Sequence, residues 1–278
     1  MKSRSGTILI TFDGVRRKEV FDKKILPYMN SLRDKEYVHE VSSMKVANKY
    51  KKSYPGYNDI LTGKVDETIT NNQHGYNKNI NFFEKYNLEP LLALAWKKFK
   101  YIYNIKRNKF RILNNHKTTR KIGKKFSNQL NKSMKSTKYK LSTRNCYKMD
   151  DCKIFNTFCY YWLKNRSPVK CGHLGFVGSD EWAHENDFSK YVEFLKYYDS
   201  CVEYIWENLL PETIIITTDH SRGKVKWQEH NNNLPESNKV WCFIISKNKK
   251  RLDASKKLFS SPPINTDIYK LLQNFILA

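Results

Sequence analysis

Three short apolar runs in this chain each end abruptly in an aspartate, and this pattern constrains the fold more than any other feature of the sequence. The runs and the aspartates that follow them are 7–12 with Asp13, 174–179 with Asp180, and 213–218 with Asp219. Each run is long enough for one buried strand and too short for a helix. Open α/β sheets bind ligands beyond the carboxyl ends of their parallel strands. We therefore expect the three aspartates to meet at one edge of a sheet.

Three histidines accompany two of these aspartates. They are His184, four residues after Asp180, His220, directly after Asp219, and His230, ten residues further on. Carboxylate and imidazole ligands suit Zn²⁺, or Mn²⁺ where more oxygen ligands are present. One aspartate after a strand is more often a turn or capping residue. Three strand ends carrying D, D-x-x-x-H and DH-x9-H are improbable by chance, so we expect them to hold metal.

Strand and helix patterns alternate along the chain, which predicts an α/β fold with a mostly parallel sheet. The strongest helical spacing lies in 186–209, where apolar residues recur at three and four. Further strands are expected at 37–47, 91–96 and 240–246, and further helices at 19–32, 154–163 and 267–277. A length of 278 residues suits a single domain, 1–278, with a sizeable core.

Ser53 lies at the start of a predicted short helix. Pro55 suits the first turn of this helix, and Gly63 suits the position just past its end. Backbone N–H groups at a helix N-terminus favour a bound anion. The alternative for Ser53 taken alone is a plain helix cap.

The formal charge of +24 is concentrated in one part of the chain. Residues 97–148 carry eighteen Lys and Arg, and 90–149 contain no acidic residue. We interpret 97–150 as a basic insert or cap that attracts a nucleic acid, an anionic membrane or a phosphorylated substrate. Its interleaved aromatic residues are typical of a surface that follows phosphates. General enrichment in Lys, Asn and Tyr is the alternative explanation.

The N-terminal apolar run is too short for a signal peptide, and no run in the sequence is long enough to cross a bilayer. The six cysteines include no C-x-x-C pair, which favours reduced thiols. Both features lead us to expect a cytoplasmic protein.

The ordered motifs ILITFDG, SYPGYNDILTG, SDEWAH, IIITTDHSRG and WQEH resemble the alkaline phosphatase superfamily. The likeness is to its smaller bacterial-type members, related to nucleotide pyrophosphatase/phosphodiesterases, and it covers the chain to about Ser246 apart from the basic insert. The resemblance implies a three-layer sandwich around the central sheet. Ser221 and Asn231 stand where the family usually has glycine, but neither change removes a ligand.

The resemblance also implies roles for individual residues. One divalent ion, zinc or alternatively manganese, would be held by Asp180, His184 and His230. A second would be held by Asp13, Asp219 and His220, together with Ser53. Ser53 stands where the family has its nucleophile, and Asn72 (or Asn71) where relatives contact phosphoryl oxygens. Arg222 and Glu19 also match, Arg222 as a substrate-binding residue or as packing behind the ligands.

These residues predict a two-metal phosphoric ester hydrolase, acting on a monoester or a diester of a phosphorylated small molecule or nucleotide. Two metals can clamp an in-line phosphoryl displacement, and a serine hydroxyl needs such activation to attack. We expect a phosphoserine on Ser53, hydrolysed in a second step. A sulfatase-like hydrolase is the nearest rival, but Ser53-Tyr54-Pro55-Gly56-Tyr57 lacks the arginine that sulfatases need. A polyanion- or nucleic-acid-binding protein that keeps a metal-bound fold without turnover is the alternative outside the enzymes.

Overall fold

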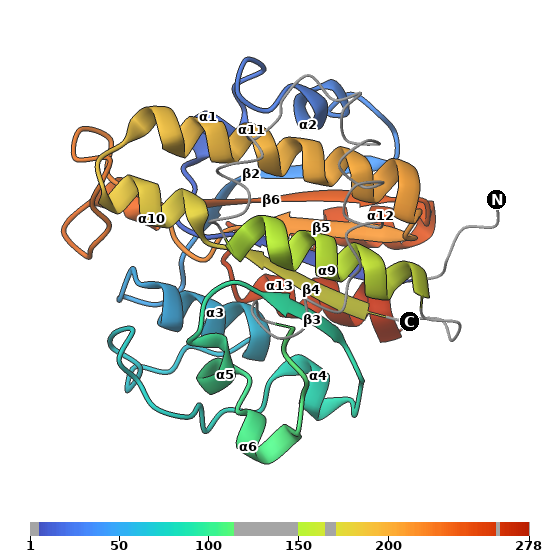
Figure 1. The fold of residues 1–278 in the computed structure, drawn as a ribbon, viewed down its shortest axis with the longest axis horizontal. Coiled ribbons are helices and arrows are strands. Elements are labelled where there is room, and N and C mark those ends of the chain that lie inside the picture. The colour runs from blue at the N-terminus through green and yellow to red at the C-terminus, as the bar shows by residue number, and fades with distance from the viewer. Residues whose placement is uncertain (1–5, 114–149, 165–170, 260–261, 278) are drawn as a thin grey trace.

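A six-stranded sheet forms the centre of the molecule (Figure 1). The computed structural model describes residues 6–113, 150–164, 171–259 and 262–277. Across the sheet the strand order is β2-β6-β5-β1-β4-β3. The strands are β1 Thr7–Phe12, β2 Val38–Lys45, β3 Leu91–Leu94, β4 Cys171–Phe176, β5 Thr213–Thr217 and β6 Lys239–Ser246.

The central strands all run in one direction. Strand β1 pairs in parallel with both β4 and β5, and β3 pairs in parallel with β4. Only β6 is reversed, because it pairs antiparallel with β5 and with β2. The carboxyl ends of β1, β4 and β5 therefore lie at one edge of the sheet, as the sequence predicts.

Helices cover both faces of the sheet (Figure 1). The first layer consists of α1 Arg17–Val20, α2 Pro27–Ser31, α9 Asp150–Lys164, α10 Gly178–His184 and α11 Phe188–Tyr204, which continues as a wider π-type turn at Ile205–Leu209. The second consists of α3 Ser53–Thr62, α4 Phe82–Lys85, α5 Phe99–Ile102, α6 Ile105–Asn108, α12 Lys249–Leu258 and α13 Asp267–Leu272, extended by Gln273–Leu277. The fold is thus the predicted three-layer α/β sandwich with a mostly parallel sheet.

The sheet is buried on both faces because β1 alternates its side chains between two apolar clusters. Ile8, Ile10 and Phe12 belong to the cluster under α9 and α11, whereas Leu9 belongs to the cluster under α3 and α13. Side chains alternate across a strand, so a continuous apolar run is what a strand covered on both sides requires.

Two sequence predictions differ from the structure. The helix expected at 19–32 is two short helices, and α2 begins at Pro27, which suits the first turn of a helix. Strand β4 ends at Phe176, so Asp180 lies on helix α10 and not at a strand end. Helix α12 was not predicted.

Only the beginning of the basic insert falls within the described residues. Phe99, Ile102 and Tyr103 are buried there against the second apolar cluster. Residues 97–113 therefore pack onto the domain as two short helices and a bridge to β3. The segment 114–149 lies outside the described residues, and with it most of the predicted polyanion-binding surface.

Within the described residues, none of the helices is both long enough and apolar enough to span a lipid bilayer.

Asp59 on helix α3 is fully buried and ties the helix to the preceding loop. Its carboxylate accepts hydrogen bonds from the backbone N–H of Asn48 (3.1 Å) and the amide of Asn58 (3.3 Å). Burial nevertheless raises the pKa of Asp59 to about 7. The carboxyl group is therefore more easily ionised in the unfolded chain, where its pKa is about 4.

We predict that replacing Asp59 with Asn changes the pH dependence of stability. The protonated Asp59 stabilises the fold below about pH 4, and this contribution is lost as the pH rises to about 7. The free energy of unfolding of the variant, relative to that of the wild type, should thus increase over this pH range by roughly 4 kcal/mol at most. Urea unfolding at pH 5 and pH 8 measures the difference, with the exposed Asp34→Asn as control. A stability difference that does not change with pH would contradict this assignment.

Candidate metal centre

The structure brings all six predicted donor residues together at the carboxyl edge of the sheet. They form two groups, Asp180–His184–His230 and Asp13–Asp219–His220, and within each group one ligand atom per residue lies within 4.8 Å of the others. The two groups are neighbours, because the rings of His220 and His230 stack with centroids 3.9 Å apart.

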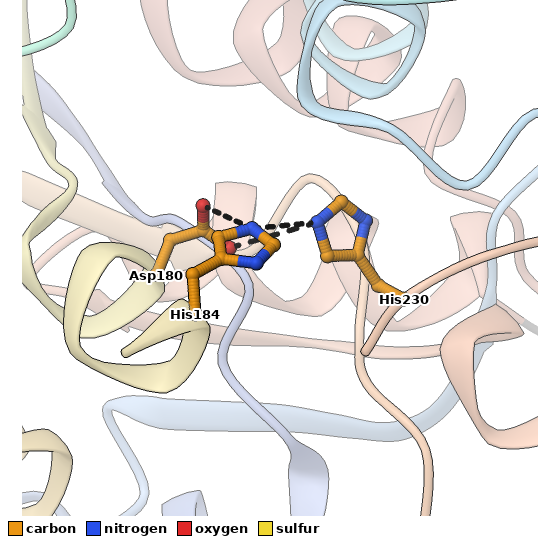
Figure 2. Close-up of side chains that lie close together, drawn as sticks. All are labelled: Asp180, His184 and His230. Atoms are coloured by element: carbon orange, nitrogen blue, oxygen red, sulfur yellow. Dashed lines mark hydrogen bonds and ion pairs between the residues drawn. The ribbon is translucent and has the colours of Figure 1, made fainter. Parts of the chain in front are cut away.

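Asp180, His184 and His230 form the first group, in which the three side chains point toward one another (Figure 2). His184 Nε2 lies 3.3 Å from Asp180 Oδ2 and 3.1 Å from His230 Nε2. His230 Nδ1 is 2.8 Å from the carbonyl oxygen of Lys51, which can only accept a hydrogen bond. This bond places the proton on Nδ1 and leaves Nε2 with a lone pair, the state that a metal ligand requires.

Helix α10 carries Asp180 and His184 one turn apart, on the same side. Its start is held by Asp151 of α9, whose carboxylate accepts the backbone N–H groups of Val177 (3.0 Å) and Gly178 (2.8 Å). Burial raises the pKa of Asp151 to about 6. The predicted spacing of Asp180 and His184 is thus realised on a helix anchored to the core.

Asp13, Asp219 and His220 form the second group, which is closed to solvent. His220 Nε2 lies 3.3 Å from Asp219 Oδ2 and 3.6 Å from Asp13 Oδ1. His220 Nδ1 is 3.1 Å from the carbonyl oxygen of Ser221, so its Nε2 also carries the lone pair. Asp219 Oδ2 is then a buried oxygen without a hydrogen-bond partner. A buried oxygen without a partner destabilises the fold unless an ion or a water molecule binds to it.

The pKa values show why these groups need a cation. Burial, together with the charges of Asp219 and Asp180, raises the pKa of Asp13 well above its usual value. Burial likewise raises the pKa of Asp219 to about 7 and lowers the pKa of His220 to about 4 and of His230 to about 2. Protein atoms alone therefore leave His220 and His230 as neutral imidazoles, beside carboxyl groups of Asp13 and Asp219 that resist ionisation. A divalent ion would reverse both effects, so the donor set fits metal.

Ser53 is the first residue of α3 and faces the second group. Its Oγ lies 3.3 Å from Asp13 Oδ1 and 3.3 Å from His220 Nε2. The N-cap position belongs to Lys52, whose side chain makes no capping hydrogen bond, so Ser53 lies inside the helix. The plain capping alternative for Ser53 is therefore wrong, and its hydroxyl group is turned toward the donors.

Gly56 allows α3 to approach the end of β5 this closely. A Cβ atom added at Gly56 would lie 2.5 Å from the backbone oxygen of Asp219. Backbone cannot move aside as a flexible side chain can, so any larger residue would displace the helix.

One turn after Ser53, the hydroxyl of Tyr57 donates to Asp13 Oδ2 (3.2 Å). Sequence reasoning missed Tyr57, although its four-residue spacing from Ser53 puts both on one face.

Asn72 belongs to the loop that follows α3, and its side chain contacts the first turn of this helix. Its Oδ1 accepts the backbone N–H of Tyr54 at 2.9 Å, next to Ser53, and the side chain is half-buried. Asn71 is exposed and bonds locally with Thr70. A contact between Asn72 and substrate stays a prediction.

Arg222 does not occupy a substrate-facing position. Its side chain is fully buried and pairs with the Asp180 carboxylate. It also donates to the carbonyl oxygens of Gly14 (3.0 Å) and Gln228 (2.6 Å). Burial opposes ionisation of Asp180, but the guanidinium and the neighbouring histidines together outweigh it and lower the pKa of this carboxyl group. Arg222 thus holds Asp180 and the loop after β1 in place, which fits the packing role, and a contact between Arg222 and substrate stays a prediction.

We predict that Zn²⁺ stabilises the wild-type protein through these donors. At about one hundred times its Kd, a bound ion adds about 2.7 kcal/mol to the free energy of unfolding. Asp219→Asn keeps the shape of the side chain but loses the anionic donor. The increase in the free energy of unfolding that Zn²⁺ causes should therefore be smaller in this variant. Thermal unfolding with and without Zn²⁺ measures it, and the exposed Glu185→Gln, which also removes one negative charge, serves as control. Equal Zn²⁺ stabilisation in Asp219→Asn and wild type would argue against the second group as a metal site.

We also predict that Gly56→Ala disturbs the centre more than an alanine elsewhere. The added methyl group meets the backbone at Asp219 and shifts Ser53 away from its partners, at a stability cost of about 1–3 kcal/mol. Gly75→Ala is the matched control, because nothing lies within 4 Å of a Cβ atom there. Thermal unfolding of both variants compares them, and equal stability would mean that the contact at Gly56 is not tight.

Comparisons with known proteins agree with this geometry. The model of the Metalloenzyme superfamily matches residues 29–260. A search of curated proteins found no match.

Solved structures resemble the chain over nearly its whole length. One is the integral membrane lipooligosaccharide phosphoethanolamine transferase A from Neisseria meningitidis (10% identity, TM-score 0.63), with 99% of this chain aligned to 55% of that protein, so the chain spans about half its length. Another is the C-terminal periplasmic domain of EptC from Escherichia coli in complex with Zn (8% identity, TM-score 0.62), covering 99% of this chain and 83% of that one.

A third is the phosphonate monoester hydrolase of Agrobacterium radiobacter (11% identity, TM-score 0.61), covering 98% of this chain and 74% of that one. At these identities the structural likeness shows the fold alone. The family match spans most of the chain and includes five of the six donors. The chain belongs to the Metalloenzyme superfamily, the alkaline phosphatase-like enzymes that depend on a divalent metal.

Proposed function

We propose that this protein is a two-metal phosphoric ester hydrolase that works through a phosphoserine on Ser53. The observation that carries the proposal is the position of the Ser53 hydroxyl, 3.3 Å from Asp13 and 3.3 Å from His220 in a buried donor group. A serine with only a structural role has no need of such partners, and a hydroxyl group becomes a useful nucleophile when its pKa is lowered.

The donor set supports two ions of the zinc type. Asp180, His184 and His230 would hold one, and Asp13, Asp219 and His220 the other. Bound there, divalent ions would supply Lewis-acid polarisation of the phosphoryl group and lower the pKa of the Ser53 hydroxyl. Imidazole nitrogen makes up half of the donors, which favours Zn²⁺ over Mn²⁺.

The side chains of the protein perform the positioning. Ser53 Oγ attacks phosphorus and gives up its proton to water as the O–P bond forms, and the ester oxygen leaves with its electron pair and takes a proton from water. The Ser53 hydroxyl donates its proton to a hydrogen bond with Asp13 Oδ1 (3.3 Å), and Tyr57 fixes this carboxylate by donating to its Oδ2 (3.2 Å). Asn72, whose Oδ1 accepts the N–H of Tyr54 next to Ser53, would donate its amide to a phosphoryl oxygen. Water then cleaves the phosphoserine, which releases phosphate or a phosphomonoester and restores Ser53.

Transfer to an alcohol in place of water is a second candidate. Several of the similar structures are named as phosphoethanolamine transferases, and the transferase from Neisseria meningitidis is one of them. His184 supports an open site, since 52% of its side chain is exposed. An acceptor other than water could reach the phosphoserine from this side.

We predict that Ser53→Ala loses at least about a thousandfold in kcat on aryl phosphate mono- and diesters, because the nucleophile is absent. The donors stay in place, so Zn²⁺ should stabilise the variant as it does the wild type. Ser43→Ala, an exposed serine on β2, is the matched control. Mass spectrometry of acid-quenched wild type should find one phosphoryl group on Ser53.

Two results would count against the hydrolase. The first is wild-type turnover that survives a strong chelator, and the second is full turnover by Ser53→Ala. Adding an alcohol acceptor separates the two candidates, because a transferase yields the new ester in excess over free phosphate.

A further inference from the structure

A second cavity lies beside the metal centre and has a different lining. Its volume is about 600 Å³, within the range of small-molecule sites. Ser221 and Arg222, which directly follow the donor His220, form part of its wall. The rest is formed by Arg16, Arg17, Lys18, Phe21, Arg33, Ser42, Lys224, Glu236 and Lys239. The lining includes neither Ser53 nor any of the six metal donors, so this cavity is a separate site.

The lining is strongly basic. Seven of its residues are Lys or Arg, and Glu236 is its single acid. Three of the arginines have carboxylate partners already: Arg16 pairs with Glu19, Arg33 with Glu40 and Arg222 with Asp180. These ion pairs hold the three guanidinium groups in place in the lining.

Four cations of the lining make no ion pair within the part of the chain that the structure describes. They are Arg17, Lys18, Lys224 and Lys239. They come from three separate segments, namely α1, the loop after His220 and the first residue of β6. Several like charges that converge on one concavity repel one another, and a bound anion would relieve this repulsion.

The cavity also offers an apolar wall. The half-buried ring of Phe21 lies under the guanidinium of Arg33, with 5.0 Å between the guanidinium carbon and the ring centroid. This contact holds the ring in place. The cavity can therefore accommodate an organic group as well as charge.

We propose that this cavity binds a small molecule that carries several phosphoryl groups. Lysine and arginine are the side chains that bind phosphate, through charge-assisted hydrogen bonds. Four unpaired cations match the several negative charges of a polyphosphate better than the single charge of a carboxylate. A concavity of about 600 Å³ suits a small molecule, whereas a polymer needs an extended basic groove. The site is independent of the chemistry at Ser53, because the two share no lining residue.

Calorimetric titration with inorganic triphosphate tests the site on the full chain as purified. Ser53→Ala serves as the parent protein, so that hydrolysis cannot consume the probe. Replacing Lys224 and Lys239 with Ala in this parent should weaken binding at least about tenfold, since hydrogen bonds to charged groups are worth that much or more. Replacing Lys78 and Lys250, exposed lysines outside the cavity, removes the same charge and should leave the Kd within about twofold of the parent.

A variant that gains affinity guards against loss by misfolding. Glu236→Gln removes the only acid of the lining and should tighten triphosphate binding. The proposal is overturned if the parent does not bind triphosphate, if both double variants bind it equally well, or if Glu236→Gln leaves the Kd unchanged. These results do not depend on turnover, so they test the cavity separately from the hydrolase.

Discussion

The burial of carboxyl groups away from water, reinforced by their mutual repulsion, is the constraint on which the rest of this structure depends. Asp13 and Asp219 lie in a space closed to solvent, and their pKa values are raised by burial and, for Asp13, by the neighbouring aspartates. An arrangement like this persists only if something positive compensates it. Arg222 compensates Asp180 at one side, but the oxygen Asp219 Oδ2 keeps no partner. Divalent ions would supply the positive charge that the protein atoms lack.

The fold creates this constraint through its sheet. Parallel strands β1 and β5 end side by side, so Asp13 and Asp219 come together although more than 200 residues separate them in sequence. The close approach at Gly56 then brings α3 and Ser53 against the same edge. One topological feature thus positions the donors and the proposed nucleophile at once, and the core on both faces of the sheet keeps them rigid.

The sequence was most informative where short-range pattern and topology agree. Asp13 and Asp219 follow fully apolar runs, and a parallel sheet must bring such strand ends together, so the donor set could be predicted without coordinates. The partners of Arg222 could not be predicted, because Gly14 and Asp180 are distant from it in sequence and a buried arginine leaves no local signal. The packed start of the basic insert was also missed, since the buried Phe99 and Tyr103 stand among lysines that mask their periodicity.

The basic cavity adds a second recognition element to the same edge of the sheet. Because its wall includes Arg222, a ligand held there would contact the same loop that fixes Asp180. The central claim is that divalent ions bind in the two donor groups. Anomalous X-ray diffraction at the zinc edge, from crystals of the protein grown with Zn²⁺, measures them directly. We expect two peaks about 4 Å apart, one in each donor group. Zinc bound only outside these two groups would contradict the account.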